Sequence, residues 1–528
     1  MADAVVTVPD NIDELKQQHI AMAKQIADLQ RELLWMREKL FGRERALFGS
    51  SSEKISNAED LQLRLFNEAE VENDKADAVE AKTVVKEHQR SNAGRKKRSN
   101  PDETVENVHD LSLEEKTCQC CGAVRPMIKQ ERSEEFDLIP AKVIRIVHLR
   151  NVYGPCPCDG FLASEEKTIV TAPGPAKIVK GSDFSNRSIA LCIGAKYAYG
   201  IPFYRVEKMY ASSGLDISRA TLSKLTMRTA VRISSVITAM NQDLARSPVI
   251  LMDETPVQVH RIPDKKPTSQ SYMWVRYGYR DKRPIVQFVY RPSRSSNTPN
   301  ALLAGYKGYL QTDGYAGYSG IGQSPGIVHV GCFAHIRRRF FEAYESMGKA
   351  GEAGRMLQLL KDLYAVERRL REKLDDGRLD DEAFTATRAV AMAPILADIK
   401  SWLDAKNGSV PPKTNLGKAI SYALEQWPKA SRFVDHTLLR PDTNLVENQI
   451  RPFVVGRKGW LFMDSPSGAT ASAAYYGLLA TAQLNGHDPV VYLTYLFDQL
   501  AARPDDAAVE DLLPYNLDPS VLKPVKTG

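Results

Sequence analysis

Three acidic residues stand where chemistry with a divalent metal would need them. Asp253 and Asp313 each end a short strand-like run, and Glu447 lies in the polar segment 442–450. A buried carboxylate is costly unless something neutralises it, and Mg²⁺ or Mn²⁺ suits an oxygen-rich site. Each aspartate alone is better explained as a turn residue at a strand end. The three together favour a metal site.

Such a site predicts phosphodiester chemistry. Two divalent ions about 4 Å apart can activate water or a 3′-hydroxyl and stabilise the leaving oxygen. We expect Asp253 to bridge two Mg²⁺ (or Mn²⁺) ions, with Asp313 completing one side and Glu447 the other. Basic residues near these positions could hold the DNA strand or neutralise charge in the transition state, and they are His335, Arg337, Arg338, Arg339, Arg451, Arg457 and Lys458.

The elements that must position these carboxylates predict a ribonuclease-H-like core. Runs 249–260, 271–280 and 285–291 are rich in Val, Tyr and Trp and predict three consecutive strands. The expected order is strand–strand–strand–helix–strand–helix–strand, with the last strand at 327–332. In that fold, carboxylates on the first and fourth strands meet at the centre of the sheet, which fits Asp253 and Asp313.

A hydrophobic seam near the N-terminus predicts a coiled coil. Nine residues from Ile12 to Leu40 recur at alternating spacings of three and four, with polar residues between them. This pattern over about four heptads predicts self-association. An amphipathic helix packed on its own domain is the alternative.

Four cysteines predict a small zinc-ribbon-like module. Cys118 and Cys121 have the usual spacing of a first zinc knuckle, whereas Cys156 and Cys158 are one residue too close for the usual second one. We expect one structural Zn²⁺ here, and buried thiols without metal are the alternative.

Two further segments are candidates for DNA contact. Residues 204–213, a turn at Gly214, and a helix capped by Ser218 have the shape of a helix-turn-helix, which would turn Lys224 and Arg228 towards DNA. An ordinary helical hairpin is equally compatible. The consecutive cations Arg95, Lys96, Lys97 and Arg98 would contact phosphates or form part of a solvated linker.

Composition limits the class of protein. The chain has 528 residues, 43% hydrophobic and 26% charged, which predicts three or more folding units. It has no apolar run long enough to span a bilayer and no secretory signal pattern, and its cysteines favour metal binding in a reducing compartment. We therefore expect a cytoplasmic protein with no membrane partner. The net charge of +6 permits a polyanionic partner without requiring one.

The predicted fold class is multidomain α/β, with a catalytic core interrupted by a helical insertion. The expected parts are the coiled coil (1–60), a flexible linker with the basic cluster (61–110), the zinc-ribbon-like module (111–175), a helical DNA-binding domain (176–245), the first part of the core (246–345), the insertion (346–438), the final core helix (439–470) and a C-terminal helical element with a tail (471–528).

Several motifs resemble one family. The segments 47–54, 253–255, 312–315, 331–340, 444–448 and 451–462 are similar to DDE transposases of the insertion-sequence 66 family. The resemblance covers nearly the whole chain. The sequence departs from the family pattern in two places. The second cysteine knuckle is one residue shorter than usual, and Ser50-Ser51 replaces residues that are arginine-rich in the family.

The resemblance implies that Asp253, Asp313 and Glu447 match the catalytic triad of the family. It implies Mg²⁺-dependent cleavage at the 3′ ends of a bacterial insertion element and joining of those ends to target DNA. The implied partners are double-stranded DNA with terminal inverted repeats, target DNA, further copies of the chain and small accessory proteins of the element. The implied cellular localisation is the bacterial cytoplasm, in association with the nucleoid.

Two other functions are compatible with the sequence. The chain could be an inactive or domesticated regulator that still binds the terminal repeats, although the intact triad argues against decay. It could also be a ribonuclease-H-like nuclease that acts on RNA or on junctions without joining ends.

Overall fold

The computed structural model describes residues 15–26, 28–29, 32, 36, 143–153, 170–347, 351–520 and 522. The chain divides into two units, Met1–Lys75 with Ile146–Gly528, and Ala76–Arg145. The basic cluster and the four candidate zinc ligands lie outside the described residues: Arg95, Lys96, Lys97, Arg98, Cys118, Cys121, Cys156 and Cys158. Within the described residues, the expectation of a mixed α/β protein with many helices is confirmed.

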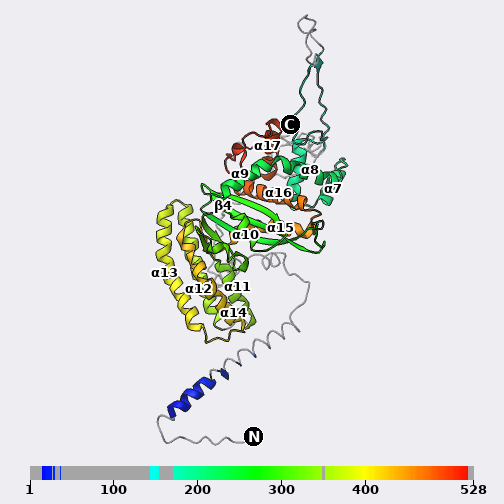
Figure 1. Cartoon of the computed structure of the whole chain (residues 1–528). Helices are drawn as coiled ribbons and strands as arrows, with labels where there is room; N and C mark the ends of the chain where they lie inside the picture. The colour runs from blue at the N-terminus through cyan, green and yellow to red at the C-terminus, as the bar shows by residue number, and fades with distance from the viewer. Residues whose placement is uncertain are drawn as a thin grey trace, which may run out of the picture. The chain divides into compact units, whose positions relative to one another are not determined.

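A five-stranded mixed sheet is the scaffold of the candidate site (Figure 1). The strand order is β5-β4-β3-β6-β7. Strand β4 is antiparallel to both neighbours, whereas β3, β6 and β7 are parallel. The bounds are β3 (Val249–Gln258), β4 (Gln270–Arg280), β5 (Arg283–Arg291), β6 (Gly308–Gln311) and β7 (Ile327–Val330). All five predicted strands are therefore present, and β3 lies between β4 and β6.

The connection between β6 and β7 differs from the expected order. It contains two 3₁₀ turns, η1 (Ala316–Tyr318) and η2 (Ile321–Gln323), where a helix was expected. Glycines at 317, 320 and 322 explain the difference, because glycine in a helix interior costs about 1 kcal/mol relative to alanine. The turn also packs tightly, since a Cβ on Gly322 would lie 2.3 Å from His329 Nδ1.

Different helices cover the two faces of the sheet. On one face, Arg276 of β4 donates hydrogen bonds to Gln287 of β5 and to Asn241 of α9 (Ser234–Leu244). The same arginine donates to the last residue of the short helix α10 (Asn297–Leu302). On the other face, the Phe288 ring lies 6.2 Å from Phe453 of α15 (Asn444–Trp460). Helices α9 and α15 thus lie on opposite faces, because successive strand residues point to opposite sides.

Helix α16 (Pro466–Leu484) lies against β5 beside α15. Gly477 permits the close approach, since a Cβ there would lie 3.0 Å from Val286 O and 3.1 Å from Phe288 N. The Val286 amide donates to Thr481 Oγ1 at 2.9 Å, so the helix also hydrogen-bonds to the strand. The face of the sheet that carries α15 is therefore closed by α16.

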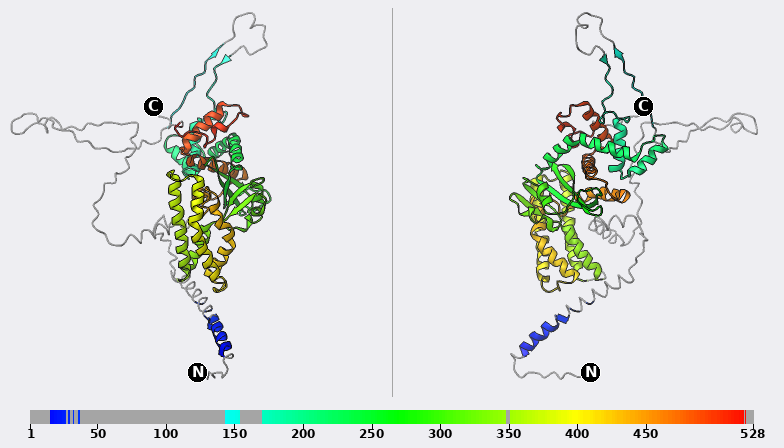
Figure 2. Two further views of the ribbon diagram at one scale, coloured as in Figure 1. Left: turned by 90° about the vertical axis from the view of Figure 1, so that its left-hand side faces the viewer. Right: turned by 45° about the vertical axis from the view of Figure 1, so that its right-hand side comes forward.

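Four helices follow β7 and precede α15 along the chain. They are α11 (Phe333–Ser346), α12 (Ala353–Asp375), α13 (Asp381–Lys406) and α14 (Asn415–Ala430). Contacts join α11 to α12, α12 to α13, α13 to α14, and α14 to α11. Figure 2 shows α12 and α13 running side by side. Met356, Leu360 and Leu363 of α12 are buried at helical spacing, so one apolar stripe of α12 faces its neighbours.

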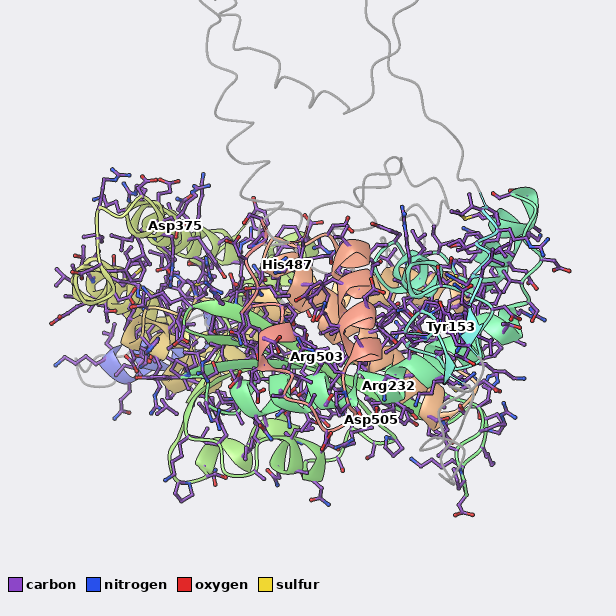
Figure 3. All side chains as sticks on the ribbon, turned by 90° about the horizontal axis from the view of Figure 1, so that it is seen from above. Tyr153, Arg232, Asp375, His487, Arg503 and Asp505 are labelled. Atoms are coloured by element: carbon purple, nitrogen blue, oxygen red, sulfur yellow. The ribbon has the colours of Figure 1, made fainter. Side chains whose placement is uncertain are left out.

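The helices that precede the sheet in the sequence pack against helices near the C-terminus. They are α6 (Asn186–Tyr197), α7 (Phe203–Ser212) and α8 (Arg219–Arg232), and α6 contacts α17 (Pro489–Ala502). A turn at Gly214, with φ of 84°, joins α7 to α8, and Ser218 caps α8 by accepting the Thr221 amide at 3.2 Å. Arg232 of α8 forms an ion pair with Asp505, which follows α17 (Figure 3).

The remaining described segments are short. Residues 15–26, 28–29, 32 and 36 are helical, and β1 (Val152–Tyr153) pairs antiparallel with β2 (Val170–Thr171). Across the described helices, none combines the length and the apolar composition that crossing a bilayer would take.

Candidate metal centre

Asp253 and Asp313 lie at matching positions of adjacent parallel strands. The register of β3 and β6 pairs Val249 with Tyr309 and Leu251 with Gln311. Asp253 and Asp313 are separated by the same number of residues as each of these pairs. Asp313 therefore follows β6 at the level that Asp253 occupies within β3. Its loop is folded back, because the Tyr315 amide donates to Asp313 Oδ1 at 3.0 Å.

Strand alternation sends Asp253 towards α15. Asp253 pairs with Val275, which pairs with Phe288 on the face that α15 covers. Glu447 lies in the first turn of α15. An acidic residue is favourable there, because the N-terminus of a helix carries partial positive charge.

Asp253 is buried in the neighbourhood of three other carboxylates. Burial raises the pKa of Asp253 well above its usual value, and the charges of Glu447, Glu254 and Asp313 raise it further. Like charges held this close repel one another unless a cation lies between them. Carboxylate oxygens are also the donors that Mg²⁺ and Mn²⁺ prefer, so Asp253, Asp313 and Glu447 fit a divalent centre.

Glu254 is close to this centre in sequence but belongs to the opposite face. Its side chain is 1% exposed and accepts from Arg294, with Nη2 at 2.6 Å and Nε at 2.7 Å. Tyr318 Oη donates to its other oxygen at 2.5 Å. The Arg294 guanidinium also stacks 3.7 Å above the Tyr315 ring. Glu254 is thus already neutralised, and it ties the loop that carries Asp313 to β3.

A second group of polar side chains surrounds Glu447. Ligand atoms of Cys332, His335 and Glu447 lie within 4.8 Å of one another. Thr443 Oγ1 lies 2.7 Å from Glu447 Oε1 and 3.3 Å from Cys332 Sγ. A hydroxyl has one proton, so it donates to the carboxylate and accepts from the thiol. Burial lowers the pKa of His335, but the adjacent Cys332 and the charges of Glu447 and Asp313 raise it to about 10.

The segment that leads into α15 is held by two buried arginines. Glu367 Oε1 accepts from Arg371 Nε of α12 at 2.8 Å and pairs with Arg388 Nη1 of α13 at 3.4 Å. Both arginines also donate to backbone carbonyls just before α15, at 2.5 to 3.0 Å, and the acceptors belong to His436, Thr437 and Leu439. The helices between β7 and α15 therefore fix the start of the helix that carries Glu447.

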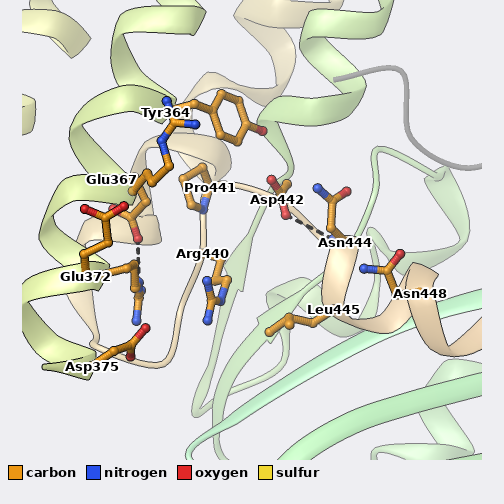
Figure 4. A pocket seen from close by; sticks show the side chains of 12 residues that line it. Tyr364, Glu367, Glu372, Asp375, Arg440, Pro441, Asp442, Asn444, Leu445 and Asn448 are labelled. Atoms are coloured by element: carbon orange, nitrogen blue, oxygen red, sulfur yellow. Dashed lines mark hydrogen bonds and ion pairs between the residues drawn. The ribbon is translucent and has the colours of Figure 1, made fainter. Parts of the chain in front are cut away.

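A pocket of about 370 Å³ lies beside this network. Figure 4 shows the Tyr364 ring of α12 pointing towards Asp442, which precedes α15, whereas Glu367 lies on the other side of Pro441. Asp442 Oδ1 accepts the Asn444 amide at 3.1 Å, which caps the turn into α15.

The candidate DNA-binding residues occupy several elements. Lys224 and Arg228 lie one turn apart and exposed on α8. Arg338 and Arg339 are exposed on α11, and both lie near Glu342. On α15, Arg451 is one turn after Glu447, Arg457 Nη1 lies 3.5 Å from Thr255 Oγ1, and Lys458 is exposed.

Arg337 is not where the sequence predicts it. Its side chain is 6% exposed, so it does not lie on a surface that DNA could contact directly. Phe333, Ile336, Arg337 and Phe340 recur at helical spacing and form the buried face of α11. The run of three arginines is therefore divided, with Arg338 and Arg339 towards solvent and Arg337 in the interior.

Sequence reasoning missed several residues of this region. The sequence held a signal for two of them. Successive residues of a strand point to opposite faces, so Glu254 could have been assigned to the face opposite Asp253. Cys332 lies three residues before His335 at the start of a helix, so the two could have been predicted to be neighbours. Arg294 and Tyr318 carry no local signal, because their partner Glu254 is distant in sequence. Thr443 lies one turn before Glu447, but its other partner, Cys332, is distant in sequence.

Comparison with known proteins gives three matches to family profiles. Residues 181–471 match the profile described as "Transposase IS66 family". Residues 477–515 match "IS66 C-terminal element", and residues 115–159 match "zinc-finger binding domain of transposase IS66". The first match alone covers more than half of the chain.

Curated relatives come from Sinorhizobium fredii (strain NBRC 101917 / NGR234). The chain is similar to "Uncharacterized protein y4qI", with 26% identity over 98% of this chain and 99% of the relative. It is also similar to "Uncharacterized protein y4jD", with 26% identity over 77% of this chain and 79% of the relative. The similarity to the first relative therefore extends over almost the whole of both chains.

Proposed function

The chain belongs to the IS66 transposase family, and on that premise we propose that it is a DNA transposase of the DDE type. It binds the terminal inverted repeats of an insertion sequence, cleaves phosphodiester bonds at the element ends and joins the 3′ ends to target DNA by transesterification. Its catalytic residues are Asp253, Asp313 and Glu447. The observation that supports this proposal is that Asp313 follows β6 level with Asp253 of β3, while Glu447 begins α15 and its charge raises the pKa of Asp253.

The strand order supports a ribonuclease-H-like core. Along the chain, the antiparallel strands β3, β4 and β5 come first, and β6 and β7 follow. Strand β6 lies parallel to β3, so the first and fourth strands of the core are adjacent. In this proposal the helices α12 to α14 belong to an insertion, residues 346–438, between the second and third catalytic residues. The buried arginines of that insertion place the start of α15.

The chain's own residues orient the reacting groups. When bound, two Mg²⁺ ions would activate the attacking water or 3′-hydroxyl and stabilise the leaving oxygen. Asp253 would be shared between the two ions, Asp313 would hold one of them and Glu447 the other. Thr443 holds one oxygen of Glu447 by donating to it, which restricts the rotation of that carboxylate.

DNA binding is proposed for the exposed cations near the centre and on α8. Phosphate contacts by lysine and arginine provide most of the affinity of a protein for duplex DNA and make it sensitive to salt. The matched zinc-finger segment, with Cys118, Cys121, Cys156 and Cys158, is proposed to hold one Zn²⁺ and to contribute to this binding. The N-terminal seam is proposed to join copies of the chain, since Leu15, Met22, Ile26, Leu29 and Met36 are exposed on their helix. Accessory proteins of the element are proposed as further partners.

A strand-transfer assay tests this function. The substrate is a labelled duplex of the inverted repeat that flanks the coding sequence, with plasmid target and Mg²⁺. The wild-type chain is expected to join 3′ ends to the target. Asp253→Asn, Asp313→Asn and Glu447→Gln should each lower joining by at least about a hundredfold and still bind the duplex. Asp404→Asn, at an exposed position of α13, is the matched control.

Two other outcomes would replace the proposal. A wild-type chain that binds the repeat tightly and never cuts it, with Mg²⁺ or Mn²⁺, would be a DNA-binding regulator. Cleavage of RNA–DNA hybrids or junctions without joining would indicate a nuclease.

A further inference from the structure

Cys332, His335 and Glu447 bring three different donor types to one place. A thiol sulfur, an imidazole nitrogen and a carboxylate oxygen lie within 4.8 Å of one another. Donors on one tetrahedral Zn²⁺ lie roughly 3.5 Å apart, given bonds of about 2.0–2.3 Å. The observed separations are thus within reach of one small ion by modest side-chain rotation.

Neighbouring contacts hold this group of donors in place. Cys332 is the N-cap residue of α11, and His335 follows one turn later on the same side of the helix. The Phe333 amide donates to Pro441 O at 2.8 Å, which joins the start of α11 to the segment that leads into α15. Thr443 then bridges the thiol and the carboxylate. The three donors therefore come from two elements that are bonded together.

The donor set does not match the hard cations of the catalytic centre. Mg²⁺ takes oxygen ligands, whereas thiolate and imidazole select Zn²⁺ and related ions. The group is enclosed, and one of its polar atoms lacks a hydrogen-bond partner. The Cys332 side chain is buried, with the residue 3% exposed, and His335 Nδ1 is buried without a hydrogen-bond partner.

We propose that Cys332, His335 and Glu447 form a binding site for a thiophilic divalent ion such as Zn²⁺. The ion takes one donor from each residue and leaves a fourth position for water. Binding requires the Cys332 thiolate and the neutral imidazole of His335, so the proton of the thiol and the proton of the imidazolium are both released to solvent. Resting on the proposed function, the consequence is inhibitory: an ion held here occupies Glu447, which then no longer serves the Mg²⁺ centre.

The test uses Co²⁺ as a spectroscopic probe of the full-length chain without DNA or Mg²⁺. A thiolate bound to Co²⁺ gives a charge-transfer absorption, and titration calorimetry counts the ions bound. The zinc-finger cysteines add the same absorption and the same number of bound ions in every variant. The test therefore compares the absorption and the ion count of each variant with those of the wild-type chain. Cys332→Ser should lower both the thiolate absorption and the number of bound ions by one site. His335→Asn and Glu447→Gln should weaken binding at this site by at least about tenfold.

Matched variants make the result decisive. Cys192→Ser, which changes another buried free cysteine on α6, should keep the wild-type spectrum. Asp253→Asn should keep it too, because Asp253 is not among the three donors. A Cys332→Ser chain with the spectrum and stoichiometry of wild type would overturn the site. That result would leave the strand-transfer assay unaffected, and a chain without strand transfer could still show the Co²⁺ signal.

Discussion

Asp313 stands beside Asp253 because β6 runs parallel to β3 in a register that aligns them. The pairing of Leu251 with Gln311 is two residues short of both aspartates. A shift of this register by one residue would turn one aspartate to the opposite face of the sheet. The position of the candidate metal centre therefore depends on the pairing of the two strands as much as on the acidic residues.

The ion pair behind the centre has a measurable energy. Arg294→Ala should lower the free energy of unfolding by about 1–3 kcal/mol, because it leaves the Glu254 carboxylate buried without its cation. Urea denaturation measures the change. The double variant Glu254→Gln/Arg294→Ala should recover part of the loss, since the unpaired charge is gone. Strictly additive losses would show that the two side chains do not interact.

The arginine network before α15 predicts a larger loss. Arg388 is fully buried, and its guanidinium contacts Glu367 and two carbonyl oxygens. Arg388→Met should destabilise the protein by about 3–5 kcal/mol in urea denaturation. Arg369→Ala, at an exposed position of α12, should stay within about 0.5 kcal/mol. Equal effects of the two substitutions would contradict a structural role for Arg388.

His329 predicts a dependence of stability on pH. Burial, together with the charges of Lys429 and Arg432, lowers the pKa of His329 from 6.5 to about 4. The unfolded chain therefore binds more protons than the folded one between these values. Stability should fall as the pH drops from about 6.5 to 4, by up to about 3 kcal/mol from this residue.

Variants separate His329 from the other titrating groups. His329→Gln should flatten the pH dependence of the free energy of unfolding in that window, whereas His19→Gln, on the exposed N-terminal helix, should not. Parallel pH profiles for wild type and His329→Gln would mean that the buried imidazole is not the source.

The N-terminal seam predicts a change of oligomeric state. Leu29 is 58% exposed on its helix, and its substitution by proline breaks that helix. Leu29→Pro should abolish self-association in light scattering, and Lys24→Asp, outside the seam, should preserve it. A Leu29→Pro chain with the mass of the wild-type oligomer would show that copies associate through another surface.

Local sequence patterns predicted the strands of the core but not the partners around the centre. Runs rich in Val, Tyr and Trp indicated β3, β4 and β5, and the turn at Gly214 indicated two successive helices. The burial of Arg337 followed from the apolar stripe of α11, which the sequence carries but which the run of three arginines obscured. The contacts of Arg294 and Arg388 depend on segments far apart along the chain, so no local pattern could reveal them.

The most direct test of the catalytic proposal is a crystal structure of the chain with a cleaved terminal-repeat end and Mn²⁺, with the ions located by their anomalous signal. We expect two Mn²⁺ ions about 4 Å apart, with Asp253 bound to both, Asp313 to one and Glu447 to the other. Ions held by other residues, or Glu447 turned away from both aspartates in the DNA complex, would contradict it.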